Sequence, residues 1–168
     1  VTIDDKLYPK LLKELYDAPP LLYYKGELVA GDEFILAVVG TRKFTAYGRQ
    51  AAERIVKDLA AHKLIIASGL ALGIDTIAHS ATLEAGGKTI AVLASGLDKR
   101  NIYPSQNRYL AEKIIASGGL ILSEFPLFTP PLKHHFPQRN RLISGLSLGT
   151  LVIEAGEKSG ALITAFHA

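Results

Sequence analysis

The sequence predicts a doubly wound α/β domain with a mostly parallel sheet. Five short, almost continuously apolar runs follow one another between residues 34 and 156, and each leads into a turn that contains glycine or proline. Segments with the helical spacing of apolar residues separate these runs. Strands that are buried on both faces and alternate with helices are typical of a parallel sheet covered by helices on each side.

Composition sets the broad class of the protein. The 168 residues are 48% hydrophobic and 21% charged, which is typical of a globular domain with one core. No run approaches the roughly eighteen consecutive apolar residues of a membrane span, and the N-terminus lacks the apolar stretch of a signal peptide. We therefore expect a cytoplasmic protein with no membrane partner.

Charge and cysteine content narrow the chemistry. Nineteen Lys and Arg against sixteen Asp and Glu leave a net charge of +3, which neither requires nor excludes a polyanionic partner. The chain has no cysteine, so a disulfide framework and a thiolate metal site are excluded.

The first 28 residues predict a short helix followed by an edge strand. Leucines at positions 7, 11, 12 and 15 approximate a helical stripe that ends at Pro19-Pro20. The run LLYYKGEL, residues 21–28, predicts a strand at the edge of the sheet. We therefore divide the chain into an N-terminal helical segment, residues 1–20, and an α/β domain, residues 21–168.

The chain has no methionine and ends in the helix-like SGALITAFHA, which predicts a fragment that lacks its C-terminal part.

The central strands are predicted from the runs FILAVVG, KLIIASG, TIAVLASG, GLILSEF and GTLVIEAG. The helices between them are predicted at residues 47–62, 71–86, 105–117 and 138–147. Ser105 is expected to be the N-cap of the third helix. Ligands of open α/β sheets bind outside the carboxyl ends of the strands, where the strand order reverses. The loops that follow these strands are therefore the places to expect a binding site.

Two of these loops have features of an anion site or of a tight turn. Gly40-Thr41-Arg42 places a hydroxyl and a guanidinium where a helix starts, and Arg suits bidentate phosphate contact; a solvated Arg beside a turn glycine is the alternative. SGLALGID, residues 68–75, matches neither a dinucleotide-binding GxGxxG loop nor a P-loop. Within it, Gly69 permits the close approach of a ligand and Gly73 permits close helix packing. Asp75 is expected to cap or anchor the loop.

The loop KHHFPQRNRLISG, residues 133–145, combines cations with an aromatic ring. Lys133 and Phe136 suit single-stranded nucleic acid, because cations follow phosphates and a ring stacks on an unpaired base. A core position is the alternative for the phenylalanine, and the proline that follows it predicts an extended backbone there. Arg139 and Arg141 are two residues apart, about 200° around a helix, so we expect one to bind and the other to anchor.

Neighbouring positions in this loop leave alternatives open. Asn140 is a candidate for a hydrogen bond either to the loop or to a phosphate. His134 and His135 are adjacent but lack a third nearby ligand, so a metal site is disfavoured.

Glu154, at the end of the last strand, supports a competing enzymatic hypothesis. A carboxylate there is placed to act as acid or base in a nucleotide phosphoribohydrolase of the lysine-decarboxylase-like Rossmann group, with Arg42 holding a nucleoside monophosphate. Against this hypothesis, no second carboxylate or serine–histidine pair accompanies Glu154. Such enzymes are also expected to carry a PGGxGT-type loop where this chain has EAGEKSG.

Five segments together resemble motifs of the DNA-processing protein family DprA/Smf, and they occur in the same order: GTR, SGLALGID, GLDKRNIYPSQN, FPQRNRLISGLS and EAGEKSGALITA. The resemblance covers residues 21–168 and implies an extended Rossmann-like core that binds single-stranded DNA without a cofactor and without catalysis. It further implies sequence-tolerant binding, a homodimer, help in loading the recombinase RecA during natural transformation, and single-strand-binding protein as a further partner.

The resemblance also implies roles for matching positions. The DNA pocket would be formed by cationic and aromatic residues: Arg42, Lys133, Phe136 and Arg139. Ser68 and Gly69 would offer hydroxyl and backbone contacts to phosphate. Three cations that each neutralise one phosphate would give a log–log salt slope of binding near −2, at about −0.7 per contact.

Overall fold

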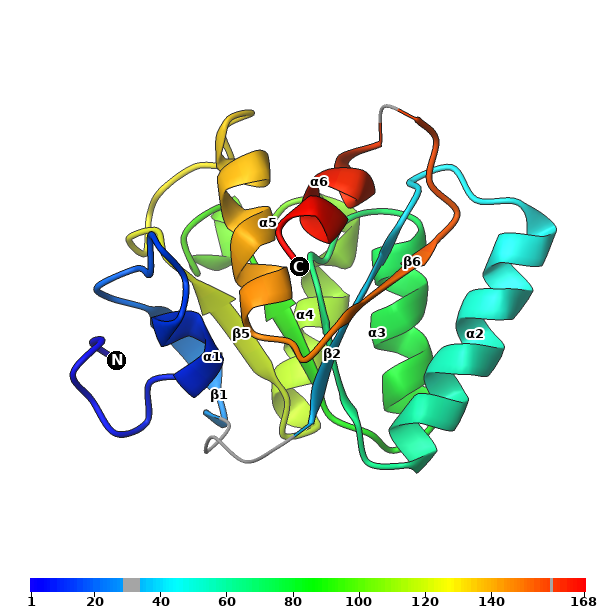
Figure 1. Cartoon of the computed structure of the whole chain (residues 1–168), viewed down its shortest axis with the longest axis horizontal. Helices are drawn as coiled ribbons and strands as arrows, with labels where there is room; N and C mark the ends of the chain where they lie inside the picture. Colours follow the sequence, from blue (N-terminus) through cyan, green and yellow to red (C-terminus); the bar gives the residue numbers. More distant parts are fainter. Residues whose placement is uncertain (29–33, 158) are drawn as a thin grey trace.

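The structure is a computed structural model that describes residues 1–28, 34–157 and 159–168. Its strands are β1 (Tyr23–Gly26), β2 (Ile35–Gly40), β3 (Ile65–Ser68), β4 (Thr89–Val92), β5 (Leu120–Ser123) and β6 (Thr150–Ile153). Among the described residues they form one six-stranded sheet in the order β1-β5-β4-β3-β2-β6 (Figure 1). β1 pairs antiparallel with β5, and all other neighbours pair in parallel. The doubly wound, mostly parallel fold with its edge strand is therefore confirmed.

Helices cover both faces of the sheet (Figure 1). One face is covered by α2 (Ala46–Ala61), α3 (Ile74–Glu84) and α4 (Arg108–Ala116), and the other by α1 (Lys10–Lys13), α5 (His135–Gly145) and α6 (Gly160–Phe166). Two short 3₁₀ helices, η1 (Lys99–Asn101) and η2 (Ser105–Asn107), lie between β4 and α4. Within the part of the chain that the structure describes, no helix is long and apolar enough to cross a membrane.

The sheet is buried on both faces, which explains why its strands read as apolar runs rather than as alternating patterns. In β2, Ala37 and Val39 belong to the apolar cluster that includes residues of α1, α5 and α6, whereas Val38 belongs to the cluster of α2 and α3. All residues of β3, β4 and β5 are buried. Because a fully buried aliphatic side chain stabilises the fold by about 1.5–3 kcal/mol, both layers of helices are held by the sheet between them.

Two helices begin where local geometry requires it. α2 begins at Ala46, one residue before its predicted start, because the Thr45 hydroxyl accepts a hydrogen bond from Gly48 N–H at 3.1 Å. α3 begins at Ile74 and not at residue 71, because Gly73 adopts a φ of +88°, which lies outside the helical region.

The third predicted helix is divided in two. Residues of η2 form a separate 3₁₀ turn, and α4 begins only at Arg108. Ser105 is therefore not the N-cap of α4, and that prediction is wrong. Asn107 occupies the N-cap position, and its side-chain amide donates to Leu70 O at 2.8 Å instead of capping the helix.

The N-terminal segment packs into the same core as the sheet. α1 covers only four residues of the predicted leucine stripe. Tyr8 and Leu12 are buried in the cluster that includes α5, and the Tyr8 hydroxyl donates to Pro19 O at 2.6 Å. Burial raises the pKa of Tyr8 to about 12, so the phenol remains a neutral donor at physiological pH.

Arg141 of α5 ties the N-terminal segment to the carboxyl end of β5. Its Nη2 donates to Glu124 Oε2 at 2.7 Å, and its Nε lies 2.7 Å from Asp17 Oδ2 without hydrogen-bond alignment. The Arg141 and Glu124 side chains are only 11% and 8% exposed. Burial raises the pKa of Glu124, and the charge of Arg141 opposes this shift. The two partners of this buried pair therefore depend on each other.

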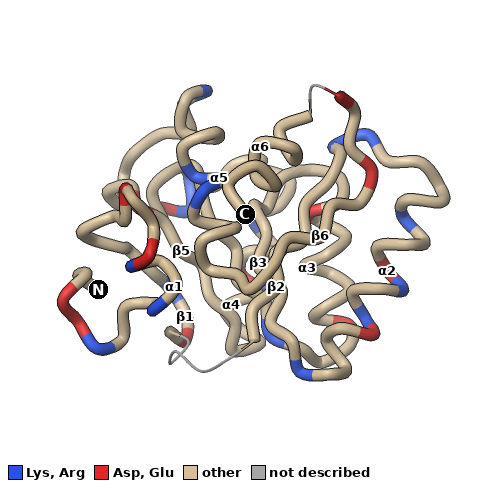
Figure 2. Tube along the Cα trace, viewed as in Figure 1, with Lys and Arg blue, Asp and Glu red and all other residues tan. Residues whose placement is uncertain are grey.

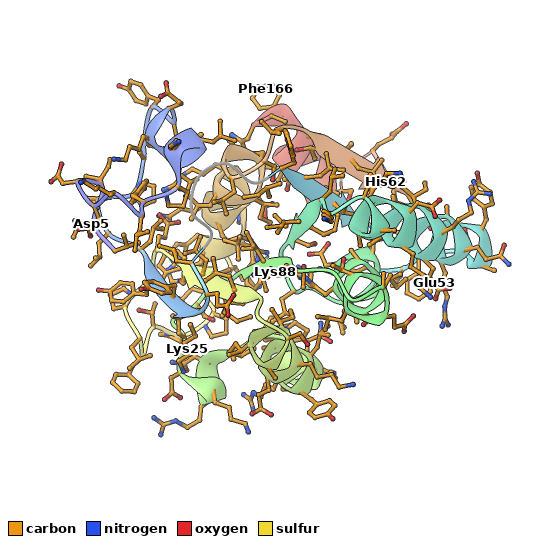
Figure 3. All side chains as sticks on the ribbon, turned by 90° about the horizontal axis from the view of Figure 1, so that it is seen from below. Asp5, Lys25, Glu53, His62, Lys88 and Phe166 are labelled. Atoms are coloured by element: carbon orange, nitrogen blue, oxygen red, sulfur yellow. The ribbon has the colours of Figure 1, made fainter. Side chains whose placement is uncertain are left out.

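The opposite edge, where the parallel strands begin, is shown in Figure 3. Lys88, just before β4, pairs with Glu27, just after β1, with 3.0 Å between Nζ and Oε2. Both side chains are largely in solvent, and such pairs stabilise a fold by about 1 kcal/mol at most. This ion pair therefore contributes little to the stability of the fold.

We expect Arg141→Met to destabilise the fold by about 3 kcal/mol at about pH 8, because it leaves the Glu124 carboxylate buried and unpaired. The pKa of Glu124 is raised in the native state above its ordinary value of 4.5. Its protonation therefore stabilises the native state below that value, and this contribution is lost as the pH rises through the raised pKa. Urea unfolding of both proteins should show a smaller loss at about pH 4 than at about pH 8.

The double variant Arg141→Met with Glu124→Gln is the control, because it leaves no buried unpaired charge; the Asp17 side chain, which also loses its partner, is 57% exposed. It should recover most of the stability that the single variant loses at about pH 8. A loss that is the same at both pH values would contradict the account of Glu124.

Candidate functional site

A cavity lies at the point where the strand order reverses. The chain runs from β2 through β3 and β4 to β5 and then returns to place β6 on the other side of β2. Near the carboxyl ends of β2 and β6, a cavity of about 490 Å³ opens between α5 and α6. Its lining includes polar residues from the loop after β2 and from both helices: Thr41, Arg42, Asn140, Ser159 and Thr164. Open α/β sheets bind their ligands at this position.

The turn that carries Arg42 is fixed from two sides. Thr41 N–H donates to Glu154 O at 2.7 Å, and Thr41 O accepts from Ile74 N–H at 3.1 Å. A Cβ atom on Gly73 would lie 2.3 Å from Thr41 O, so only glycine lets the start of α3 come this close. The prediction that Gly73 serves close packing is confirmed. The exposed Arg42 side chain therefore projects from a rigid backbone.

Arg42 and Phe136 meet at the cavity. Arg42 Cζ lies 5.8 Å from the centroid of the Phe136 ring, which is a cation–π distance, and both residues line the cavity. Phe136 is half-buried, so it is not a core phenylalanine. Within the described residues, Arg42 makes no hydrogen bond or ion pair through its guanidinium, which leaves its donors free for an anion.

Phe136 is helical, which corrects the predicted extended backbone. α5 begins at His135, three residues before its predicted start at residue 138, and Pro137 is its third residue. Pro137 is tolerated there because the N–H groups of the first turn have no intrahelical acceptor. The buried His135 ring stacks on Phe125 at 4.0 Å between centroids and holds the start of the helix.

Lys133 is exposed and lies two residues before α5. The loop that carries it and the loop between β2 and α2 lie at the same edge of the sheet (Figure 1). Figure 2 shows Lys or Arg on both loops, although cations are distributed over the whole trace. Arg42 and Lys133 therefore lie on loops at the same edge of the sheet, although Lys133 does not line the cavity. We define the rim as Arg42, Lys133 and Phe136.

Arg139 anchors α5 from the inside. It is 4% exposed, and its Nη1 donates to Gly69 O at 2.7 Å and to Val92 O. Burial lowers the pKa of Arg139 to about 10, so the guanidinium stays charged at neutral pH. Arg141 is held in the ion pairs described above. Both arginines therefore anchor, where one was expected to bind and the other to anchor. Because Arg139 also lines the cavity, its contact with a ligand stays a prediction.

Ser68 and Gly69 are committed to the fold. The buried Ser68 hydroxyl donates to Val38 O at 2.7 Å. Gly69 N–H donates to Asp75 Oδ2 at 3.1 Å, and a Cβ atom on Gly69 would lie 2.7 Å from the guanidinium of Arg139. The implied contacts of both residues to phosphate are corrected, because the Ser68 hydroxyl is bonded to β2 and the Gly69 N–H to Asp75 of α3. Gly69 permits the close approach of Arg139 rather than of a ligand.

Asp75 anchors the loop after β3, as predicted. Its Oδ2 accepts hydrogen bonds from Gly69 N–H and, at 3.3 Å, from Ala71 N–H. Burial raises the pKa of Asp75, and the charge of Arg139 and the two N–H groups oppose this shift. Asp75 thus places a carboxyl group next to the buried guanidinium.

Asn140 bonds within the protein. Its Nδ2 donates to Gly160 O at 3.3 Å, and its Oδ1 accepts from Arg139 Nε at 3.2 Å. Of the two alternatives that the sequence leaves open, these bonds support the one to the protein. Because Asn140 also lines the cavity, its contact with a ligand stays a prediction.

Glu154 bonds the N-cap residue of α2, Thr45, and is not a free carboxylate. Its Oε2 accepts from Thr45 N–H at 2.8 Å, and its Oε1 accepts from the Thr45 hydroxyl. Its backbone has a φ of +52°, in the left-handed region. The phosphoribohydrolase hypothesis needs this carboxylate as an acid or base and is therefore not favoured. Lys158 of the same loop lies outside the described residues.

Two features near the rim complete its description. His134 and His135 meet edge to face, with 4.5 Å between ring centroids, and in residues 1–28, 34–157 and 159–168 no group of three side chains is arranged to hold a metal ion. The Tyr103 ring lies 5.7 Å from that of Phe136. The sequence does not predict this contact, because Tyr103 follows a charged turn that is equally typical of a purely structural loop.

Comparison with known proteins identifies the family. The sequence profile of DNA recombination-mediator protein A matches residues 1–168. The chain is 44% identical over 169 residues to the DNA processing protein DprA of Bacillus subtilis, covering 100% of this chain and 56% of that protein. It is 46% identical over 165 residues to the protein Smf of Escherichia coli, covering 98% and 44%. The chain thus spans about half the length of these curated relatives.

Solved structures agree with the sequence match. DNA processing protein A from Streptococcus pneumoniae superposes with a TM-score of 0.90 at 46% identity, covering 99% of this chain and 57% of that one. The corresponding protein from Helicobacter pylori, whose structure describes a single-stranded DNA binding mode, gives 0.86 at 34% identity, covering 100% and 75%. A molybdenum cofactor binding protein from Rippkaea orientalis, at 0.56 and 17% identity, shares the fold alone. On these matches, the chain belongs to the DNA recombination-mediator protein A family, DprA/Smf.

Proposed function

We propose that the chain binds single-stranded DNA, with little dependence on sequence, through the rim of Arg42, Lys133 and Phe136. The observation that carries this proposal is the 5.8 Å contact between the Arg42 guanidinium and the Phe136 ring at the cavity. A cation next to an accessible ring meets both needs of single-strand binding, because phosphates are bound by charge and bases by stacking. The single-stranded DNA binding mode described for the Helicobacter pylori relative supports the same ligand.

Each residue of the rim has a separate task in this proposal. Arg42 and Lys133 contact phosphates, and Phe136 stacks on one base. The cavity of about 490 Å³ lies within the range of about 300–1,000 Å³ that holds small ligands, so it has room for a nucleotide unit. Arg139 acts indirectly, because it fixes the position of α5. The proposal contains no catalytic step and no cofactor.

For the whole protein, we propose a further role as a cytoplasmic homodimer that helps to load RecA on single-stranded DNA in natural transformation. The family description supports the recombination-mediator part of this proposal. Single-strand-binding protein is then the partner that must be displaced. The test follows RecA filament formation on DNA coated with single-strand-binding protein, with and without the complete protein. Equal rates in the two reactions would contradict this role.

Substitutions in the rim should weaken DNA binding without unfolding the chain. We expect Arg42→Ala and Lys133→Ala each to reduce the affinity for an oligothymidylate roughly tenfold, the scale of one charge-assisted hydrogen bond. Phe136→Leu should remove about 1–3 kcal/mol, the contribution of one stacked base. Fluorescence anisotropy titrations measure the affinities, and circular dichroism melting shows that the variants are folded. Wild-type affinity in all three folded variants would refute the rim.

Two further variants separate binding from stability. Arg54 is an exposed cation on α2 and does not line the cavity, so Arg54→Ala is the matched control and should bind normally. Arg139→Met should lower the melting temperature together with the affinity, because it leaves Asp75 buried without its cation. An Arg139→Met protein of normal stability that binds poorly would instead indicate that Arg139 contacts DNA.

The salt dependence of binding reports the number of phosphate contacts. Because Arg139 is buried, only Arg42 and Lys133 remain, and at about −0.7 per contact they predict a log–log slope near −1.4 instead of −2. Titrations between roughly 0.05 and 0.2 M salt measure this slope, and Arg42→Ala should make it shallower by about 0.7. A steeper slope that Arg42→Ala leaves unchanged would place the phosphates elsewhere.

A further inference from the structure

Tyr103 presents a half-open ring beside Phe136. It is 50% exposed, and its ring centroid lies 5.7 Å from that of Phe136, with 75° between the ring planes. Its hydroxyl makes no hydrogen bond to any other described residue. Neither burial nor a polar contact therefore accounts for an aromatic residue at this position.

The backbone around Tyr103 is held in place. Pro104 and Ile102, its two neighbours, are buried. Ile102 O accepts from Arg108 Nε at 3.3 Å, and the Asn107 amide donates to the loop after β3 at 2.8 Å. The ring is therefore presented by a fixed support.

A shallow hollow connects Tyr103 with the cavity. The residues that line this hollow are Arg42, Ala71, Leu72, Tyr103, Pro104 and Phe136. Three of them, Arg42, Ala71 and Phe136, also line the cavity. A DNA strand that leaves the cavity across Phe136 and follows the hollow therefore meets Tyr103.

We propose that Tyr103 is a second base-stacking residue, and that the two rings together make the site favour flexible pyrimidine strands. This inference rests on the proposed function, because it extends the same interface by one nucleotide. Tyrosine is suited to this task, since every base has a π-face and an aromatic side chain stacks on any of them.

The angle between the rings explains the preference. Bases that stack on each other are nearly parallel, so two stacked bases cannot lie flat on two rings that stand at 75°. A strand that uses both rings must therefore bend and unstack between the two bases. Purine runs resist this bend more than pyrimidine runs, because preferences of single-strand sites follow stacking strength and backbone flexibility. Paired bases in a duplex are excluded for the same reason.

Tyr109 provides the matched control. It is 66% exposed on α4, and Lys113 Nζ lies 4.8 Å from its ring centroid. It lines neither the cavity nor the hollow. Substitutions at Tyr109 therefore change an exposed tyrosine without changing the proposed interface.

The first experiment measures how the 168-residue chain binds oligothymidylate and oligodeoxyadenylate of equal length at one salt concentration. We expect Tyr103→Leu to lower the affinity for oligothymidylate by about 5- to 150-fold, the range for the loss of one stacked base. The preference for thymidine over adenosine strands should decrease as well. Tyr103→Phe should keep both properties, and Tyr109→Leu should leave both unchanged.

The second experiment uses Tyr103→Trp. The natural chain contains no tryptophan, so this variant has a single indole emitter. Oligothymidylate should quench its emission, because a base stacks on the indole. An abasic strand of the same length keeps the phosphates and should leave the emission unchanged. Tyr109→Trp should respond to neither strand.

Three results would overturn the inference. Tyr103→Leu binds oligothymidylate as the natural chain does, or the abasic strand quenches Tyr103→Trp as strongly as oligothymidylate, or Tyr103→Leu loses the same affinity for abasic and base-bearing strands. The last result would mean that Tyr103 acts on phosphate contacts or on the fold, and that no base stacks on it. Loss of binding in Arg42→Ala and Phe136→Leu would still uphold the proposed function in each case, whereas normal binding in those variants would overturn that function too.

Discussion

The position of the rim depends on the hydrogen bonds that the buried guanidinium of Arg139 makes. This guanidinium donates to the carbonyl groups at the ends of β3 and β4, so one side chain joins α5 to two strands, and it interacts electrostatically with the carboxyl group of Asp75. A buried charge without partners costs several kcal/mol, and this site meets that cost with carbonyls and a carboxyl group. Because Arg139 lies one turn after Phe136 in α5, its bonds also set the position of the ring beside Arg42.

The site has an inner and an outer layer of polar and aromatic residues. The inner layer holds strand ends and helix starts: Ser68, Asp75, Arg139 and Glu154 bond to backbone or to each other. The outer layer consists of the rim and Tyr103, whose functional groups face the cavity, the hollow or solvent. This division follows from the doubly wound topology, because loops at a strand-order reversal must both close the sheet and carry the ligand site. Substitutions in the two layers therefore have different consequences for stability and for binding.

The sequence predicts the sheet and the position of the rim well, because strands buried on both faces leave an apolar signal and ligand loops follow their carboxyl ends. It does not predict the direction of Arg139. The helical spacing correctly predicts that Arg139 and Arg141 point to different sides of α5. Both sides are covered, however, one by the sheet and the other by the N-terminal segment, so both arginines are held within the protein. Ser68 fails for a related reason: a hydroxyl at a strand end looks the same whether it bonds a phosphate or the neighbouring strand. Tyr103 is missed because its partner, Phe136, lies in α5, far along the chain.

The contact between Arg42 and Phe136 does not oppose DNA binding, although it covers part of the ring. An exposed cation–π contact is worth about 0.5–1 kcal/mol, whereas stacking a base on the ring is worth about 1–3 kcal/mol. A base that takes the face of Phe136 beside Arg42 therefore replaces a weaker interaction with a stronger one. The displaced guanidinium then meets a phosphate of the same strand, and a hydrogen bond between charged groups is worth about 1.5–3 kcal/mol. Both residues gain from the exchange, so a single rigid turn can hold the cation against the ring and still release it to the nucleic acid.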